Sequence, residues 1–177
     1  MKKYEFTGET KEIKLLFRTA VLHRIRATVS FGFVKIGDLG GWIEKEENLS
    51  HEGKAWVCGD AKVWGNAKVC GDAEVCGDAK VCGDAKVCGD AEVFSASHVL
   101  VIGAIGSRND FTTFYRDKDN EITVKCGCFL GKIDRFLEKV TQTHGDSKYA
   151  LVYRAAVEVA KLQIDLLGEA PKDADEE

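Results

Sequence analysis

One short segment, with the strand that follows it, holds most of the side chains in this chain that suit ligand binding. Between Ile105 and Arg116, arginine, hydroxyl and amide groups alternate with aromatic rings. Arginine with hydroxyl and amide donors suits a phosphate or a similar small anion, and aromatic faces suit a base or another flat ring. The candidate ligand-binding residues are Ser107, Arg108, Asn109, Thr112, Thr113, Phe114, Tyr115, Arg116 and Lys125. The pattern leaves open a second interpretation, an ordinary hairpin with a polar turn at Asn109 and surface threonines.

Cysteine and histidine are the other residue types that could do chemistry. Cys126 and Cys128 are one residue apart, whereas a redox pair has two residues between its cysteines, so we interpret them as strand thiols. His144, beside Gly145, is interpreted as a residue at a helix C-terminus rather than as a general base. None of the cysteines has the Cys-x2-4-Cys spacing of zinc ligands. We therefore predict no catalytic residue, no metal site and no cofactor.

The remaining cysteines share one place in a repeat. Reading from Ala55, the chain repeats as AWVCGD, AKVWGN, AKVCGD, AEVCGD, AKVCGD, AKVCGD and AEVFSA, which is seven units of six residues. Ala-x-Val-x alternates with the period of a strand, so the alanines and valines are expected to point inward. Gly-Asp or Gly-Asn then turns the chain, because these residues tolerate left-handed backbone conformations.

Three such units would close a coil of about 18 residues, the geometry of a left-handed β-helix. Every third unit then stacks, which predicts that Val63 lies beside Val81. By the same register Cys58 should stack on Cys76 and Cys70 on Cys88, as thiols in a reducing compartment. The corner alanines are expected to be small because three walls meet in a narrow interior.

The segments on either side of the repeat read as a cap and a separate module. The N-terminal part is predicted to form a β cap with strands at Tyr4 to Phe6, Ile13 to Phe17 and Val21 to Val29. After the repeat, Val99 to Ile102 has the pattern of a buried strand. It is followed by a hairpin whose strands run from Phe111 to Tyr115 and from Ile122 to Cys128 around a polar turn.

Two helices are predicted after the hairpin. Apolar residues from Ile133 to Val140 keep helical spacing, and Gly145 ends this first helix. The second helix begins after an N-cap at Ser147 and runs to about Leu167. Its apolar residues extend beyond one face, which predicts a homo-oligomer, either a dimer or a trimer.

The predicted fold class is mainly β with C-terminal α. It comprises a short left-handed parallel β-helix of about two to three coils, capped by N-terminal strands and followed by a small α+β module. The predicted domains are an N-terminal β cap with an entry rung (1–54), the β-helix (55–94), the C-terminal module (95–168) and a disordered acidic tail (169–177).

Composition limits the functions that are open to the chain. The 177 residues carry a net charge of -4, so generic binding to a nucleic acid polymer or an anionic membrane is not expected. No stretch approaches the roughly 20 apolar residues of a membrane span, and the opening residues lack the apolar core of a signal peptide. We expect the protein to stay in the cytoplasm where it is made.

Three motifs ahead of the repeat, together with the repeat itself, resemble a known family. The motifs are Leu22-His-Arg-Ile-Arg-Ala27, Gly37-Asp-Leu-Gly-Gly-Trp-Ile43 and Glu47-Asn-Leu-Ser-His-Glu-Gly53. This part of the chain looks like a family of hexapeptide-repeat proteins from prophages, gut phages and enterobacterial genomes. The second half is similar to a module that phage members carry behind variable numbers of repeats. The resemblance implies a phage or bacterial origin and a C-terminal unit on a scaffold of adjustable length.

These observations support three functional hypotheses. The leading one is a non-catalytic phage or prophage protein whose C-terminal module binds a small anionic, nucleotide-like ligand, for example as a sponge that sequesters an immune signal. The second is a structural or assembly protein whose β-helix and helices drive homo-oligomerisation. The third is an acyltransferase-like hexapeptide protein, in which His51 and His98 flank the repeat, although so few coils leave little wall for an acyl-donor cleft.

Overall fold

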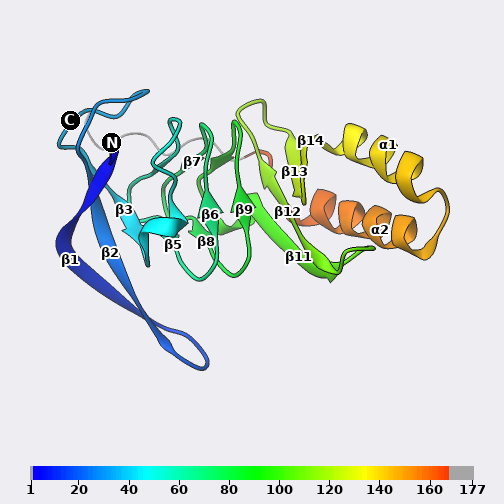
Figure 1. Ribbon diagram of the computed structural model, residues 1–177, viewed down its shortest axis with the longest axis horizontal. Coiled ribbons are helices and arrows are strands. Elements are labelled where there is room, and N and C mark those ends of the chain that lie inside the picture. The colour runs from blue at the N-terminus through cyan, green and yellow to red at the C-terminus, as the bar shows by residue number, and fades with distance from the viewer. Residues whose placement is uncertain (1, 168–177) are drawn as a thin grey trace.

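Figure 1 shows an elongated molecule with strands at one end and two helices at the other. The computed structural model describes residues 2–167. Along its length it passes from an N-terminal hairpin through the hexapeptide repeat to a four-stranded sheet and then to the helices. Within this part of the chain, no helix has both the length and the apolar character needed to cross a membrane.

The N-terminal strands form an antiparallel sheet that joins the repeat. β1 (Tyr4–Lys14) pairs with β2 (Thr19–Ala27), and β2 pairs with β3 (Leu39–Ile43). The predicted strand that would have ended at Phe17 is wrong at its C-terminal end, because Leu15 donates from its backbone N–H to the carbonyl of Arg18 and closes a turn there. Phe17 is 94% exposed at the tip of this hairpin.

Seven two-residue strands follow, one in each repeat unit. They are β4 (Trp56–Val57), β5 (Lys62–Val63), β6 (Lys68–Val69), β7 (Glu74–Val75), β8 (Lys80–Val81), β9 (Lys86–Val87) and β10 (Glu92–Val93). Partners lie 18 residues apart in parallel pairs, so Val63 lies beside Val81 as predicted. The three resulting ladders are β4-β7-β10, β5-β8 and β6-β9. From Ala55 to Val93 every alanine and valine is at most 1% exposed, so the predicted inward ladder is confirmed.

The predicted fold class, a left-handed parallel β-helix, is wrong for this molecule. Its longer strands lie in antiparallel and mixed sheets, and the purely parallel ladders, β4-β7-β10 and β6-β9, consist of two-residue strands. The largest sheet, β1-β2-β3-β5-β8, is antiparallel as far as β3 and parallel beyond it, and the sheet after the repeat is antiparallel throughout. The physical reason is that each ladder has only two or three very short rungs, so the longer flanking strands extend the repeat in their own antiparallel pattern.

A four-stranded antiparallel sheet covers the far end of the repeat. A 3-10 turn, η2 (Ala96–His98), precedes it, just as η1 (Glu46–Asn48) follows β3 at the other end. The strands are β11 (Val99–Ile105), β12 (Asp110–Arg116), β13 (Ile122–Cys126) and β14 (Phe129–Lys132), in that order. Tyr115 belongs to the core that fills the repeat, whereas its neighbour Phe114 belongs to a second core under the helices. Strand alternation therefore gives the sheet one face toward the repeat and one toward the helices.

The two helices pack on the second face. α1 (Ile133–His144) ends at Gly145 as predicted, and α2 (Lys148–Gln163) begins after Ser147. α2 stops earlier than predicted because Ile164 is extended and the backbone N–H of Asp165 donates to the carbonyl of Ser97, which draws the chain back to η2. The predicted acidic tail, 169–177, lies outside the described residues.

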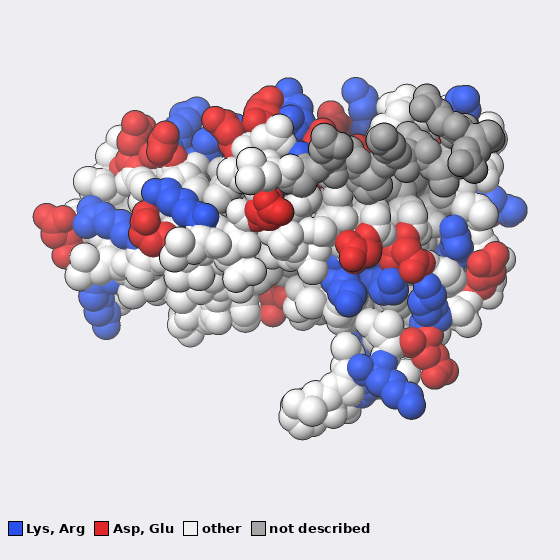
Figure 2. All heavy atoms as spheres, turned by 180° about the vertical axis from the view of Figure 1, so that it is seen from behind, with Lys and Arg blue, Asp and Glu red and all other residues white. Residues whose placement is uncertain are grey.

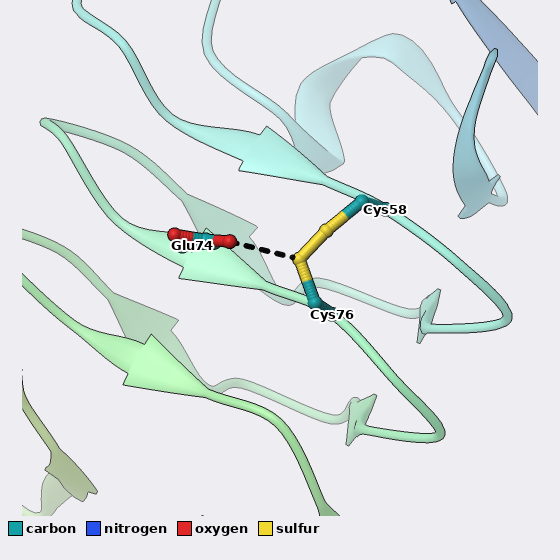
Figure 3. A group of neighbouring side chains, drawn as sticks. All are labelled: Cys58, Glu74 and Cys76. Atoms are coloured by element: carbon teal, nitrogen blue, oxygen red, sulfur yellow. Dashed lines mark hydrogen bonds between the residues drawn. A yellow bond between two sulfur atoms is a disulfide. The ribbon is translucent and has the colours of Figure 1, made fainter. Parts of the chain in front are cut away.

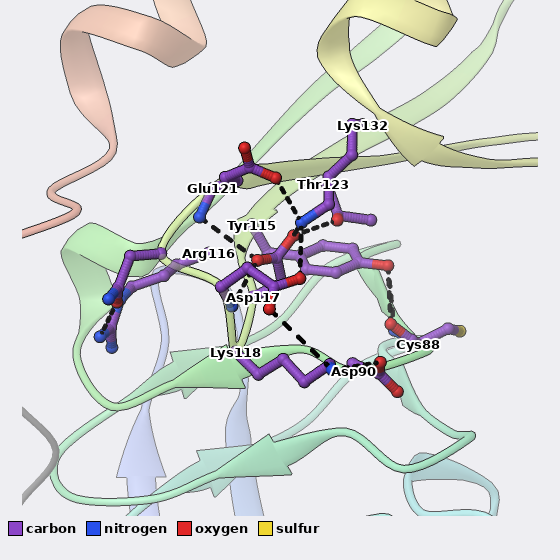
Figure 4. A network of polar contacts seen from close by, with 11 residues as sticks. Cys88, Asp90, Tyr115, Arg116, Asp117, Lys118, Glu121, Thr123 and Lys132 are labelled. Carbon is purple, nitrogen blue, oxygen red and sulfur yellow. Dashed lines mark hydrogen bonds and ion pairs between the residues drawn. The ribbon is translucent and has the colours of Figure 1, made fainter.

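The repeat and the C-terminal sheet are joined by side chains of β12. The Tyr115 hydroxyl donates to the Cys88 carbonyl at 2.8 Å (Figure 4). Thr113 Oγ1 accepts from the Lys86 backbone N–H at 3.0 Å. Both contacts satisfy backbone groups of the last rung of the β6-β9 ladder, which has no further strand to pair with. We call this junction the seam.

Asp117 holds the turn that follows β12. Asp117 is 3% exposed. Its carboxylate accepts hydrogen bonds from Lys132 Nζ at 2.6 Å and from Thr123 Oγ1 at 2.5 Å (Figure 4). Burial alone would raise the pKa of Asp117. The hydrogen bonds from Lys132, Thr123 and the backbone N–H groups of Asp119 and Glu121 outweigh it, so the pKa is lowered.

Overpacking one repeat alanine should destabilise the protein. We expect Ala79→Leu to lower the free energy of unfolding by roughly 1–3 kcal/mol, because the added atoms have no free space in the interior. Urea denaturation measures the change, and Lys80→Leu at the exposed neighbouring residue is the control. Equal effects of the two substitutions would contradict the inward placement of Ala79.

Asp117→Asn should destabilise the protein in a pH-dependent way. Since the folded-state pKa is depressed, the carboxylate stabilises the fold above its unfolded pKa, about 3.9, and this contribution is lost as pH falls through the folded pKa. We expect a difference of about 1–3 kcal/mol from wild type at neutral pH that shrinks below about pH 4. Asp119→Asn, on an exposed carboxylate, is the control, and a difference that grows on acidification would refute this account.

Candidate functional site

The structure separates the nine predicted ligand-binding residues into three groups. Strand alternation turns one group toward the repeat, a second toward the helices, and leaves the third in the turn between β11 and β12. In that order the groups are Thr113, Tyr115 and Lys125; Thr112, Phe114 and Arg116; and Ser107, Arg108 and Asn109. Side chains that are close in the sequence are thus not brought together as one site.

Four of these residues lie in packed interiors. Thr112, Thr113, Phe114 and Tyr115 are each at most 1% exposed. The alternative interpretation, a hairpin with surface threonines, is also wrong on this point, because Thr112 and Thr113 are both buried. Thr112 contacts the Cys126 sulfur at 3.3 Å, and the Phe114 ring packs edge-on against Phe136. Their contacts are with the protein itself.

Arg116 is also held by the fold. It is 5% exposed, and its Nε donates to Asn120 Oδ1 at 3.0 Å, with Nη2 directed at the same oxygen. The guanidinium lies 5.3 Å from the centre of the Phe94 ring, a cation-π distance. Nη1 is buried and has no hydrogen-bond partner among the described residues.

Ser107 and Arg108 line a pocket between two turns of the sheet and the two helices. We call this cavity of about 380 Å³ the helix pocket. Its walls are formed by Ser107, Arg108, Asp110, Cys126, Gly127, Cys128, Phe129, Phe136, Lys139, Val140, Thr143, His144 and Tyr153. The inner wall is mainly aromatic and aliphatic, whereas Arg108 and Lys139 are exposed cations at its edge. Neither cation forms a hydrogen bond or an ion pair with a described residue.

Tyr153 of α2 shapes the inner end of the helix pocket. Its ring packs edge-on against Phe136 at 5.5 Å and stacks with His144 at 5.8 Å between centres. Burial, and to a smaller extent the neighbouring Cys126, raises the pKa of Tyr153 to about 12. The phenol therefore stays neutral and can donate a hydrogen bond. A Cβ on Gly106, which has a φ of +72°, would lie 1.9 Å from the Tyr153 hydroxyl, so this close approach requires glycine.

Sequence reasoning missed the helical half of this pocket. Lys139 and Thr143 are four residues apart and therefore share one side of α1. This side adjoins the apolar face that contains Phe136 and Val140, which was assigned only to the core. A cation and a hydroxyl at this spacing beside an apolar face are the signal that could have indicated a pocket wall.

Lys125 lies in a second depression on the opposite face of the sheet. We call this cavity of about 730 Å³ the lysine pocket. It is lined by Glu46, Glu47, Leu49, Ser50, His51, Lys68, Val69, Cys70, Lys86, Cys88, Lys125 and Gly127. Lys125 Nζ donates to the Gly127 carbonyl at 2.7 Å. Gly127 lines both pockets, so they adjoin at this residue.

The repeat cysteines are paired rather than free. Disulfides join Cys58 to Cys76 and Cys70 to Cys88, which corrects the prediction of stacked thiols. The register of the ladders explains the pairing, because it places the two Cα pairs 4.6 Å and 4.7 Å apart, within the range that a disulfide spans.

Figure 3 shows the Glu74 carboxylate beside the first disulfide, 3.3 Å from Cys76 Sγ. Candidate ligand atoms of Cys58, Glu74 and Cys76 lie within 4.8 Å of one another. Thiolates, not disulfide sulfurs, are the ligands of zinc. While Cys58 and Cys76 are joined by a disulfide, the Glu74 carboxylate is therefore the one group of the three that can bind a cation.

The two histidines that flank the repeat accept hydrogen bonds from the backbone. His51 Nδ1 accepts from the Lys3 N–H at 3.1 Å, and His98 Nδ1 accepts from the Phe94 N–H at 3.1 Å. Burial lowers the pKa of both rings, and Arg116 lowers that of His98 further. Each ring is thus a neutral acceptor that fixes a turn. The two residues on which the acyltransferase hypothesis relied therefore have a structural role.

Comparison with known proteins adds no relative. A scan against protein-family models found no match, and neither did a search of curated proteins. The resemblance to phage and enterobacterial hexapeptide-repeat proteins therefore remains a prediction from motifs.

The cysteine pairing predicts how many thiols can be alkylated. Of the seven cysteines, Cys82, Cys126 and Cys128 are free, so protein that is alkylated in denaturant without reductant should gain three adducts. The same treatment after reduction should give seven. The alkylating reagent is added at lysis so that the thiols are blocked at once, and intact mass spectrometry counts the adducts. Seven adducts without reductant would contradict the disulfides.

Proposed function

We propose that the protein binds a small anionic ligand with a flat or apolar part in the helix pocket, without chemical turnover. The observation that carries this proposal is the combination of an aromatic inner wall with two cations, Arg108 and Lys139, that pair with no described residue at the edge of one cavity. In view of the resemblance to phage proteins, the role that we propose is a sponge that sequesters a nucleotide-like immune signal in a bacterial cell.

The size and lining of the pocket suit such a ligand. A cavity of about 380 Å³ lies at the lower end of the roughly 300–1,000 Å³ that ligand pockets enclose. The rings of Phe129, Phe136 and Tyr153 offer apolar surface on which a base or another flat group can pack. Because these rings pack against one another, this surface is fixed before the ligand arrives.

The charges of the pocket favour an anion over a cation. Arg108 and Lys139 face one carboxylate, that of Asp110, in a chain whose net charge is -4. Arg108 donates in a fork that matches a phosphate or carboxylate, and Lys139 adds a point charge. The hydroxyls of Ser107 and Thr143 supply further donors on the same walls.

Calorimetry with a panel of cyclic and ADP-ribose-type nucleotides tests this function. We expect at least one of them to bind, and Arg108→Ala to weaken it by roughly tenfold to a hundredfold, the effect of losing a charge-assisted hydrogen bond. Arg135→Ala removes an exposed arginine of α1 outside the pocket and should leave the affinity unchanged. No heat from any member of the panel would remove the proposal.

Assembly is a second candidate, and the exposed apolar side of α2 favours it. Leu151 is 58% exposed, Val159 48% and Leu162 90%. Homo-oligomerisation through this side would cover them. Light scattering and calorimetry of two variants separate the two functions. Loss of an oligomer in Leu162→Glu with unchanged nucleotide binding favours assembly, whereas an Arg108→Ala variant that keeps its oligomer and no longer binds the nucleotide favours ligand binding.

A further inference from the structure

The lysine pocket contains two lysine ammonium groups that pair with no described residue. Lys68 and Lys86 are register partners on the parallel strands β6 and β9, so their backbones are about 4.8 Å apart. Like charges directly opposite each other destabilise a sheet. Neither ammonium group forms a hydrogen bond or an ion pair with a described residue. An anion that bound between them would relieve this repulsion.

A third lysine continues the row across the seam. The backbone N–H of Lys86 donates to Thr113 Oγ1, and Thr113 is the register partner of Lys125. Lys125 therefore follows Lys86 on the same side of the molecule, where all three lysines line one depression.

His51 adds a donor to the same pocket. Since its Nδ1 accepts from the Lys3 N–H, the neutral ring carries its proton on Nε2. This nitrogen is buried and has no hydrogen-bond partner among the described residues. The Glu46 carboxylate lies 4.0 Å away, beyond hydrogen-bond distance. An oxygen of a bound anion would satisfy the unused donor.

The acidic residues of the pocket do not cancel its lysines. Glu46 forms an ion pair with Lys2 at 2.5 Å, and the hydrogen bond from Lys2 lowers the pKa of this carboxyl. Glu47 is the other carboxylate on the pocket wall. Among the residues that line the lysine pocket, three lysines therefore face one carboxylate that is not paired with Lys2. Asp84 and Asp110 line the adjoining depression that Lys68 and Lys86 share, and neither forms an ion pair with these lysines.

Gly127 connects this row to the helix pocket. A Cβ on Gly127 would lie 3.2 Å from Arg108 Nη1, which approaches it from the helix pocket. Lys125 binds the carbonyl of the same glycine and lines the lysine pocket. The cations of the two pockets thus flank one residue that has no side chain.

We propose that the ligand carries two separated anionic groups and spans both pockets across Gly127. This inference rests on the proposed function. Arg108 and Lys139 hold the anionic group that lies nearest the flat part of the ligand. Lys68, Lys86 and Lys125, with His51 Nε2, hold the second. The ligand class is accordingly a nucleoside bisphosphate or another nucleotide with phosphates at both ends, rather than a nucleoside monophosphate.

Calorimetry on the full chain with two matched probes tests the proposal. The probes are a nucleoside monophosphate and the bisphosphate that adds one phosphate on the other side of the same ribose. We expect the bisphosphate to bind at least tenfold tighter to the wild type. Lys86→Gln should abolish that difference and leave the monophosphate affinity unchanged. Lys80→Gln, an exposed lysine of the β5-β8 ladder, should change neither value.

The outcomes separate this inference from the function on which it rests. If neither probe binds the wild type but a nucleotide of the first panel does, the two-pocket ligand is overturned while the proposed function stands. If no nucleotide of either set binds, the proposed function fails and the inference fails with it. If the monophosphate binds and the second phosphate adds no affinity, or if Lys86→Gln keeps the full advantage of the bisphosphate, the two-pocket ligand is overturned while the proposed function stands. Circular dichroism of the two variants confirms that both are folded.

Discussion

Backbone hydrogen bonds between residues about 18 positions apart fix the register on which the other features of this molecule depend. The Lys62 N–H donates to the Ala79 carbonyl and the Trp64 N–H to the Val81 carbonyl, and the same step recurs through the repeat. This register places valine on valine inside the repeat and lysine on lysine outside it. It also brings the cysteines into pairs that can be oxidised. Stability, charge and redox chemistry in this segment thus share one cause.

The register also leaves a last rung whose backbone groups need partners. β12 supplies them through Thr113 and Tyr115, and this requirement explains why these two side chains are unavailable to a ligand. The same docking brings the C-terminal sheet beside the lysines of the repeat. On the face that Figure 2 shows, lysine and arginine side chains lie among acidic ones, so no broad cationic surface is seen there.

The sequence was informative where a feature depends on local spacing. The hexapeptide period, the inward Ala and Val positions and the helix that ends at Gly145 could all be predicted, because strand alternation, turn chemistry and helix periodicity act over a few residues. The fold class was not predictable in this way. How β3 joins β5, and how β12 meets the last rung, depends on pairings between distant segments.

The candidate site shows the same division. Its arginine, Arg108, was identified from residue type, but the neighbours along the strand were assumed to share its site, although adjacent strand residues face opposite ways. The true neighbours of Arg108, among them Lys139 and Tyr153, come from the two helices. Only tertiary packing brings them to the turn, so no pattern within the segment itself could have indicated them.

The three ladders limit how the length of the repeat can change. Each six-residue unit advances the chain from one ladder to the next, so a whole set of three units returns it to the ladder where it began. Inserting or deleting three units would keep Lys86 and the strand that docks on it in the same relative orientation. A change of one or two units would place a different ladder at the end of the repeat, so β12 would meet a rung other than β9 and the pocket that His51 and Lys125 share would be lost. Length variation that preserves both pockets is therefore confined to steps of 18 residues.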